Sequence, residues 1–127
     1  MINAPDIITW PSGKWSARLI CSDSESPLTP RLDRQGDQII IYSGYRSGKA
    51  EIWTEYWSRL STLVAHEFPT VHPTQSIYDA GVTSLNIVES INKLSENGVN
   101  LGIVDVFDYP SPAELTAIAV ERHIEND

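Results

Sequence analysis

Apolar residues in the second half of the chain recur every three or four positions, the spacing of helices that bury one face. Helix-breaking residues end two of these runs, with Pro69 after the first and Asn97-Gly98 after the second. The pattern predicts helices over residues 49–68, 84–97, 103–108 and from 112 onward. The first helix carries an apolar stripe made of Trp53, Trp57, Leu60 and Val64.

Local signals mark the beginnings of the second and the last of these helices. Thr83 can act as an N-cap, which places Ser84 in the first helical turn. Residues 111–114, Ser-Pro-Ala-Glu, have the order of a capping box with proline at the first helical position. The last five residues, 123–127, are expected to fray.

The first part of the chain has a different pattern, with short β-prone runs separated by turn residues. Strands are predicted over residues 6–10, 15–21, 31–34 and 38–42. We therefore expect a β-rich appendage over residues 1–47, followed by a helical domain over residues 48–127. The fold class predicted is mainly α, with a small N-terminal sheet.

A sheet of this size buries little apolar surface by itself. It is therefore expected to pack against the helical part or to pair with another protein. Strand edges are ready docking sites, and Trp10, Trp15 and Tyr42 would anchor a docked partner. The alternative for each of these three side chains is burial in the core, which is the commoner role.

The net charge of −8 belongs entirely to the helical part. Residues 1–47 hold five basic and five acidic side chains, whereas residues 48–127 hold four basic and twelve acidic ones. Such an acidic domain repels nucleic acid and anionic membrane and attracts basic protein surfaces. No apolar run reaches the length of a membrane span, and no leader sequence is evident, so we expect a cytoplasmic protein.

Ser84 has the most suggestive position for chemistry, at the junction between a polar loop and a helix. A hydroxyl there lies in the positive field of the helix N-terminus, which suits a phosphate ester. A hydrolytic triad of Ser84 with His66 or His72 is the enzymatic alternative. The chain lacks the Gly-x-Ser-x-Gly elbow and a parallel-sheet pattern, so no catalytic residue is predicted.

Metal and disulfide chemistry are not indicated either. The three histidines are scattered along the chain and far from Cys21, so no metal site is predicted. Because Cys21 is the sole cysteine, an internal disulfide is excluded.

Three segments in order resemble acyl and peptidyl carrier proteins: Asp79–Leu85, Gly98–Leu101 and Val106–Leu115. The resemblance covers roughly residues 50–124, and the Phe-Asp-Tyr-Pro element resembles carriers of polyketide synthases more than those of peptide synthetases. It implies a four-helix carrier bundle that performs no chemistry itself. Ser84 would receive 4'-phosphopantetheine from coenzyme A, and the arm would hold acyl or peptidyl intermediates as thioesters.

The resemblance also implies partners and the residues that meet them. The partners would be a phosphopantetheinyl transferase and the ketosynthase, acyltransferase, condensation or tailoring enzymes of a polyketide or non-ribosomal peptide pathway. Leu85 and Val88 match the base of the arm, and Asn86 and Glu89 match the outward face that partners read. Ile103–Phe107 matches the short third helix that flanks the arm in this family. The full set implied for partner recognition is Thr83, Leu85, Asn86, Val88, Glu89, Ile103 and Val106.

One position departs from the family pattern. Many acyl carriers have Asp directly before the serine and many peptidyl carriers have His, but this chain has Thr83. A threonine still caps a helix, so modification is expected to survive. The alternative function is a carrier-like or docking module that mediates protein–protein interaction without being modified.

Overall fold

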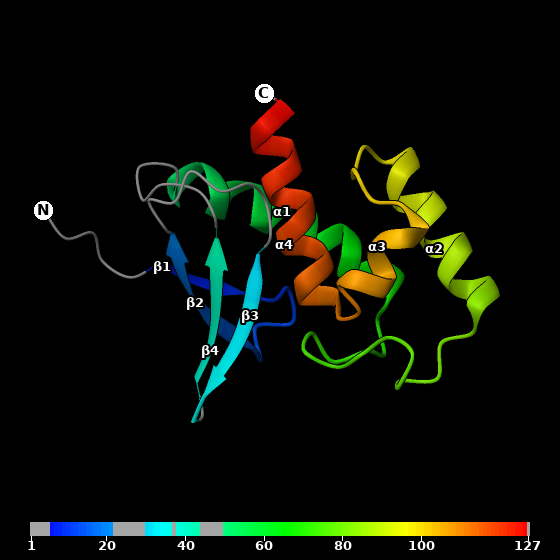
Figure 1. The fold of residues 1–127 in the computed structure, drawn as a ribbon, viewed down its shortest axis with the longest axis horizontal. Helices are drawn as coiled ribbons and strands as arrows, with labels where there is room; N and C mark the ends of the chain where they lie inside the picture. The colour runs from blue at the N-terminus through cyan, green and yellow to red at the C-terminus, as the bar shows by residue number, and fades with distance from the viewer. Residues whose placement is uncertain (1–5, 22–29, 37, 44–49, 127) are drawn as a thin grey trace, which may run out of the picture.

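A computed structural model describes residues 6–21, 30–36, 38–43 and 50–126 of the chain, which form a small sheet beside four helices (Figure 1). The strands are β1 (Asp6–Thr9), β2 (Ser16–Cys21), β3 (Arg31–Gln35) and β4 (Gln38–Ser43). The helices are α1 (Ala50–Glu67), α2 (Ser84–Glu96), α3 (Ile103–Asp108) and α4 (Pro112–Asn126). The predicted boundary between residues 47 and 48 falls outside the described residues.

The sheet is mixed, with the strand order β1-β2-β4-β3. The outer pairs, β1 with β2 and β3 with β4, are antiparallel, whereas the central pair β2 with β4 is parallel. Alternating residues of the strands face the helices, as the pleat requires. The buried members of this inward face are Ile8, Ala17, Leu19, Ile39 and Ile41.

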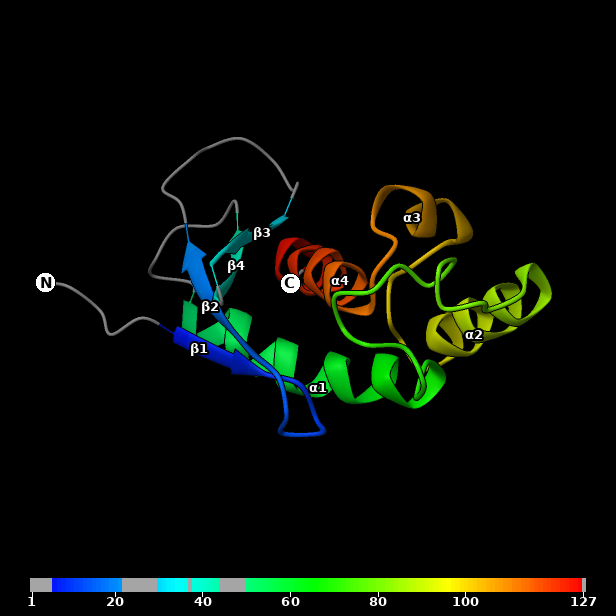
Figure 2. The same ribbon diagram turned by 90° about the horizontal axis from the view of Figure 1, so that it is seen from below.

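α1 and α4 lie between the sheet and the other two helices, as the two perpendicular views show (Figures 1 and 2). β1 runs beside α1, and α2 and α3 lie on the side away from the strands. Buried side chains from the strands and all four helices belong to one continuous hydrophobic core. The sheet therefore completes the core of the helical part instead of standing apart from it.

α4 is buried on almost every side because it lies in this middle layer. Its buried residues include small and polar ones, and they are Pro112, Ala113, Leu115, Thr116, Ala117, Ile118, Ala119, Val120, Glu121 and Ile124. A helix that is buried all round packs against neighbours on all its faces. The predicted fraying of residues 123–127 is wrong for 123–126, because α4 continues to Asn126, Ile124 is buried and His123 is within hydrogen-bond distance of the Gly98 carbonyl at 2.9 Å.

Four tryptophans join the sheet to α1. The rings of Trp53 and Trp57 stack at a centroid distance of 5.5 Å, and Trp10 meets Trp57 edge-on at 5.8 Å. The indole nitrogen of Trp57 donates a hydrogen bond to the Thr9 carbonyl at 2.9 Å. Aromatic contacts of this kind stabilise a core beyond the area that they bury.

This packing bears on the predicted docking anchors. Trp10 is buried, so its side chain is not accessible to a partner and its predicted docking role is wrong. Trp15 is half-buried and packs on the same cluster, with its ring 6.2 Å from that of Trp10. Tyr42 is half-buried under the guanidinium of Arg31, which lies 4.6 Å from the ring centroid. Docking through Trp15 and Tyr42 stays a prediction.

Among the described residues, no helix has both the length and the hydropathy needed to cross a membrane.

Candidate functional site

The loop before α2 is held by hydrogen bonds to the beginning of α4. The Ile77 amide donates to the Pro110 carbonyl at 2.8 Å, and the Ala113 amide donates to the Pro73 carbonyl at 2.9 Å. Val71 and Ile77 fix the loop from inside by burying their side chains. Gly81 turns the chain toward α2 with a φ of 83°, a conformation that glycine adopts without Cβ strain. The approach to Ser84 is therefore ordered by tertiary contacts.

The N-terminus of α2 leaves polar groups open beside Ser84. As predicted, Thr83 is the N-cap, and its hydroxyl accepts a hydrogen bond from the Asn86 amide at 3.2 Å. The amides of Ser84 and Leu85 donate no hydrogen bond to any described residue. Ser84 itself is exposed. Two free amides and the helix dipole therefore surround an accessible hydroxyl.

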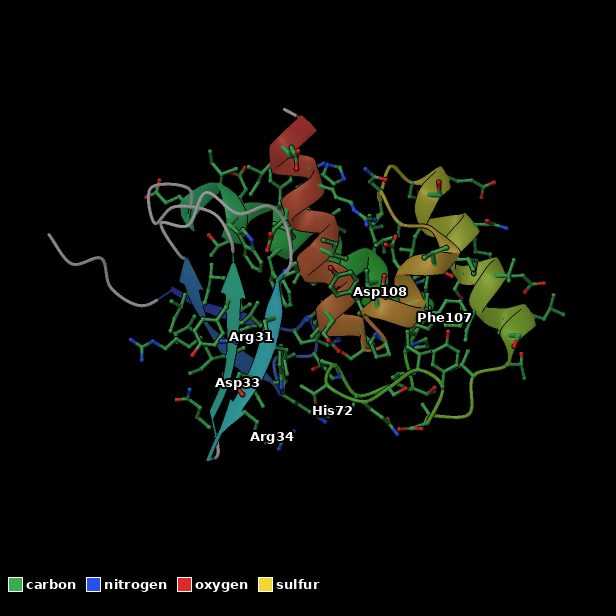
Figure 3. The ribbon with its side chains drawn as sticks, viewed as in Figure 1. Arg31, Asp33, Arg34, His72, Phe107 and Asp108 are labelled. Atoms are coloured by element: carbon green, nitrogen blue, oxygen red, sulfur yellow. The ribbon has the colours of Figure 1, made fainter. Side chains whose placement is uncertain are left out.

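Exposed apolar side chains lie on α2, on α3 and in the loop that precedes α2. They are Tyr78, Leu85, Val88, Val104 and Phe107, and we call them the apolar rim. Phe107 is 70% exposed, yet its ring lies 6.1 Å from that of Tyr78 in a stacked arrangement. Figure 3 shows Phe107 and Asp108 on α3, away from Arg31, Asp33 and Arg34 of the sheet. An exposed apolar cluster of this kind is typical of a protein interaction site.

The sequence predicted only some of the residues of this rim. Leu85 and Val88 were predicted, but Tyr78, Val104 and Phe107 were not assigned as recognition residues. Val106 was assigned and is fully buried, so its predicted role in direct contact with partners is wrong. Its side chain packs in the core and anchors α3, while Ile103 is half-buried against the same core. A six-residue helix has too few turns for the sequence pattern to separate its inner from its outer face.

The polar recognition residues lie on another part of α2. Asn86 and Glu89 are exposed, as predicted, and they line a groove of about 300 Å³ between α2 and the end of α1. Ser90 and Lys93 continue the same wall, and the Ser90 hydroxyl donates to the Glu67 carbonyl at 3.5 Å. On a helical wheel this wall is separated from Ser84 and Val88, so α2 offers two distinct surfaces.

α3 is tied to α4 by a two-pronged ion pair. The Nη1 and Nη2 atoms of Arg122 each donate to one Asp105 carboxylate oxygen at 2.7 Å. The Gly102 amide donates to Asp105 Oδ2 at 2.7 Å and so caps the first turn of α3. These hydrogen bonds from Arg122 hold the pKa of Asp105 below its ordinary value of 3.8, against the opposing effect of burial.

Among the residues that the structure describes, no base is hydrogen-bonded to the Ser84 hydroxyl, as a hydrolytic triad would require. The Ser84 hydroxyl makes no hydrogen bond with another described residue, and the Nδ1 atom of His72 is 2.9 Å from the Thr74 hydroxyl. Within the described ranges, no group of three or more His, Cys, Asp or Glu side chains could hold a metal ion.

The fold and the site together define a small helical domain that offers one exposed serine at a capped helix N-terminus. A family model described as the phosphopantetheine attachment site matches residues 55–119, just over half of the chain. The chain therefore belongs to the family of phosphopantetheine-binding carrier domains. No solved structure matches the chain.

Family membership settles the cofactor and the broad role. Domains of this family attach 4'-phosphopantetheine covalently and are not catalytic themselves. They work with phosphopantetheinyl transferases and with biosynthetic enzymes. The residues present fit the group, because α2 begins with an exposed hydroxyl and two amides that can face an anionic phosphodiester.

Proposed function

We propose that Ser84 is the attachment point of the 4'-phosphopantetheine arm. The observation that carries this proposal is the exposed Ser84 hydroxyl beside the open amides of Ser84 and Leu85, within the segment that the family model matches. The helix N-terminus would stabilise the negative phosphodiester by roughly 0.3–1 kcal/mol at an exposed site. When bound, the group supplies the terminal thiol on which intermediates are held as thioesters.

The second step of the proposal concerns delivery. We infer that the arm carries acyl or peptidyl intermediates to the enzymes of a polyketide or non-ribosomal peptide pathway. The Phe107-Asp108-Tyr109-Pro110 element, which resembles polyketide synthase carriers, favours the polyketide case. Transfer in such a system needs brief contacts with several enzymes, and small interfaces with charged surroundings provide them.

Partner recognition would use both surfaces of α2. The apolar rim lies on α2, on α3 and in the loop that leads to Ser84, and it would enter an apolar recess at the mouth of a partner's active site. Thr83 at the helix start and Asn86 and Glu89 on the neighbouring surface of α2 would supply polar contacts, and Ile103 would support the rim by packing on the core. This role of the rim is supported by the exposure of five large apolar side chains on α2, on α3 and in the loop before α2, because exposed apolar surface marks interaction sites.

An intact-mass measurement tests the attachment. The protein is incubated with coenzyme A and a broad-specificity phosphopantetheinyl transferase, and the expected gain is the mass of one phosphopantetheine group. Ser84→Ala should abolish the gain. Ser95→Ala is the matched control, because Ser95 is an exposed serine on the same helix, and it should be modified like the wild type.

The rival function is an interaction module that is never modified, with Ser84 only the first residue of a helix. No mass gain in the folded wild type would support this rival. An equal gain in mass in Ser84→Ala would show that the arm is attached to another residue, and it would overturn the assignment to Ser84.

A further inference from the structure

α3 needs support from outside its own backbone. It comprises only six residues, Ile103–Asp108, and an isolated helix of this length is unstable in water. Its exposed apolar side chains, Val104 and Phe107, nevertheless form a large part of the apolar rim. The contacts that hold α3 in place therefore also decide where this part of the rim lies.

One guanidinium makes most of the polar contacts that hold α3. Arg122, on α4, donates to both carboxylate oxygens of Asp105 at 2.7 Å and to the Asn100 carbonyl at 3.1 Å. It thereby joins α4 to the first turn of α3 and to the segment that leads into it. The burial of Val106 supplies the apolar part of the attachment.

The geometry of the pair favours a real energetic contribution. The side chains of Arg122 and Asp105 are only 29% and 11% exposed, so solvent screens their interaction less than that of a surface pair. Two parallel charge-assisted hydrogen bonds also define the orientation of both groups. Removing one partner would leave the other charge partly buried without compensation.

We propose that the Asp105–Arg122 pair is a positioning element for partner recognition. It holds α3 so that Phe107 stays stacked on Tyr78, which belongs to the loop that leads to Ser84. Neither charged side chain would touch the arm or the partner, and both act through Val104 and Phe107. The proposal rests on the attachment at Ser84 and adds that recognition depends on a contact from the last helix of the fold.

The Asp105–Arg122 pair affects binding through the fraction of molecules in which α3 is correctly placed. If the variant protein has α3 in place for only a fraction of the time, the apparent affinity for a partner falls by that fraction. The chemical step after binding is unchanged, because the attacking Ser84 hydroxyl is on α2. The expected signature is therefore a rise in KM with little change in kcat.

The experiment uses the full chain and a phosphopantetheinyl transferase with coenzyme A as the partner. Arg122→Met removes the charge and keeps an apolar stem. Arg122→Lys keeps the charge but has no planar guanidinium that can donate two parallel hydrogen bonds. Asp105→Asn keeps an oxygen that can accept from the Gly102 amide. Arg59→Met is the matched control, since Arg59 is an exposed arginine on α1 that stacks on Tyr56 at 5.6 Å.

Two readouts are measured for each variant. Amide hydrogen exchange of residues 103–108 should become roughly tenfold faster in Arg122→Met, with exchange in α2 unchanged. KM for the carrier should rise roughly three- to tenfold with kcat within about twofold. The exchange rate and KM of Arg122→Lys should lie between those of Arg122→Met and the wild type. Both values for Arg59→Met should equal those of the wild type.

Unchanged exchange in α3 together with unchanged KM in a folded Arg122→Met would overturn the proposal. If circular dichroism shows that Arg122→Met does not fold, Asp105→Asn carries the same test with the same expected direction. A wild type that is not modified at all would defeat the proposed function instead. In that case the exchange of α3 still decides whether the pair positions this helix.

Discussion

At the scale of single residues, the beginning of α2 follows from short-range chemistry. Thr83 caps the helix through a hydrogen bond to the amide three residues ahead, and this contact needs no distant partner. Many carriers have Asp or His where this chain has Thr83, and the threonine therefore leaves the helix cap intact. What changes is the charge beside Ser84, which a modifying enzyme would meet directly.

This local role of Thr83 leads to a prediction on stability. Thr83→Ala should lower the free energy of unfolding by about 1 kcal/mol, because the Asn86 amide loses its acceptor. Thr83→Asp should keep the stability at or above that of the wild type, since aspartate also caps a helix and its charge favours the N-terminus. Urea unfolding measures both variants, and equal stability of Thr83→Ala and the wild type would contradict the cap.

At the scale of elements, the positions of the helices were predictable and their burial was not. The predicted helices at 49–68, 84–97 and 103–108 agree with α1, α2 and α3 within one residue at each end. The spacing of Leu115, Ile118 and Ala119, together with the stem of Arg122, predicts a single inward face for α4. The sheet on one side, and α3 with the loop before α2 on the other, cover further faces of α4, and the α4 sequence alone does not show that these neighbours exist.

The tryptophan cluster gives the prediction at this scale. Trp10→Ala should reduce the free energy of unfolding by about 3–5 kcal/mol, because it leaves a cavity between β1 and α1. Ile7→Ala, on the strand β1 that directly precedes Trp10 but with a largely exposed side chain, should change it by about 0.5 kcal/mol or less. Chemical denaturation followed by tryptophan fluorescence measures both, and a mild effect of Trp10→Ala would mean that the sheet contributes little to the core.

At the scale of the whole molecule, charge separates the sheet from the helices. Residues 50–126, the part of the chain that holds the four helices, contain three basic and eleven acidic side chains. This part therefore carries the excess negative charge. The arginines Arg31 and Arg34 lie on the sheet, on the other side of the molecule from Phe107 and Asp108 (Figure 3). A partner with a basic entrance would therefore be steered toward the helical side.

Salt dependence tests this steering. The KM of a phosphopantetheinyl transferase for the carrier should rise severalfold between low and high salt, because ions screen exposed charges over a Debye length of about 10 Å at 0.1 M. Glu89→Gln should weaken the dependence, since Glu89 is exposed on α2. A KM that does not vary with salt would show that apolar contacts alone decide the encounter.

The amino-acid sequence by itself determined the features that depend on neighbours within a few positions. These are the cap at Thr83, the place of Ser84 in the first turn, the helix stop at Gly98 and the ordered motifs that mark the carrier family. Helix caps and turns are made by groups close along the chain, so their residue types report them directly.

The tertiary structure alone decided which side chains of these elements are accessible. It buried Val106 and Trp10, stacked Phe107 on Tyr78 and joined Arg122 to Asp105 across 17 positions of the chain. Each of these outcomes depends on how two elements pack against each other, and the periodicity of either element by itself carries no record of its neighbour.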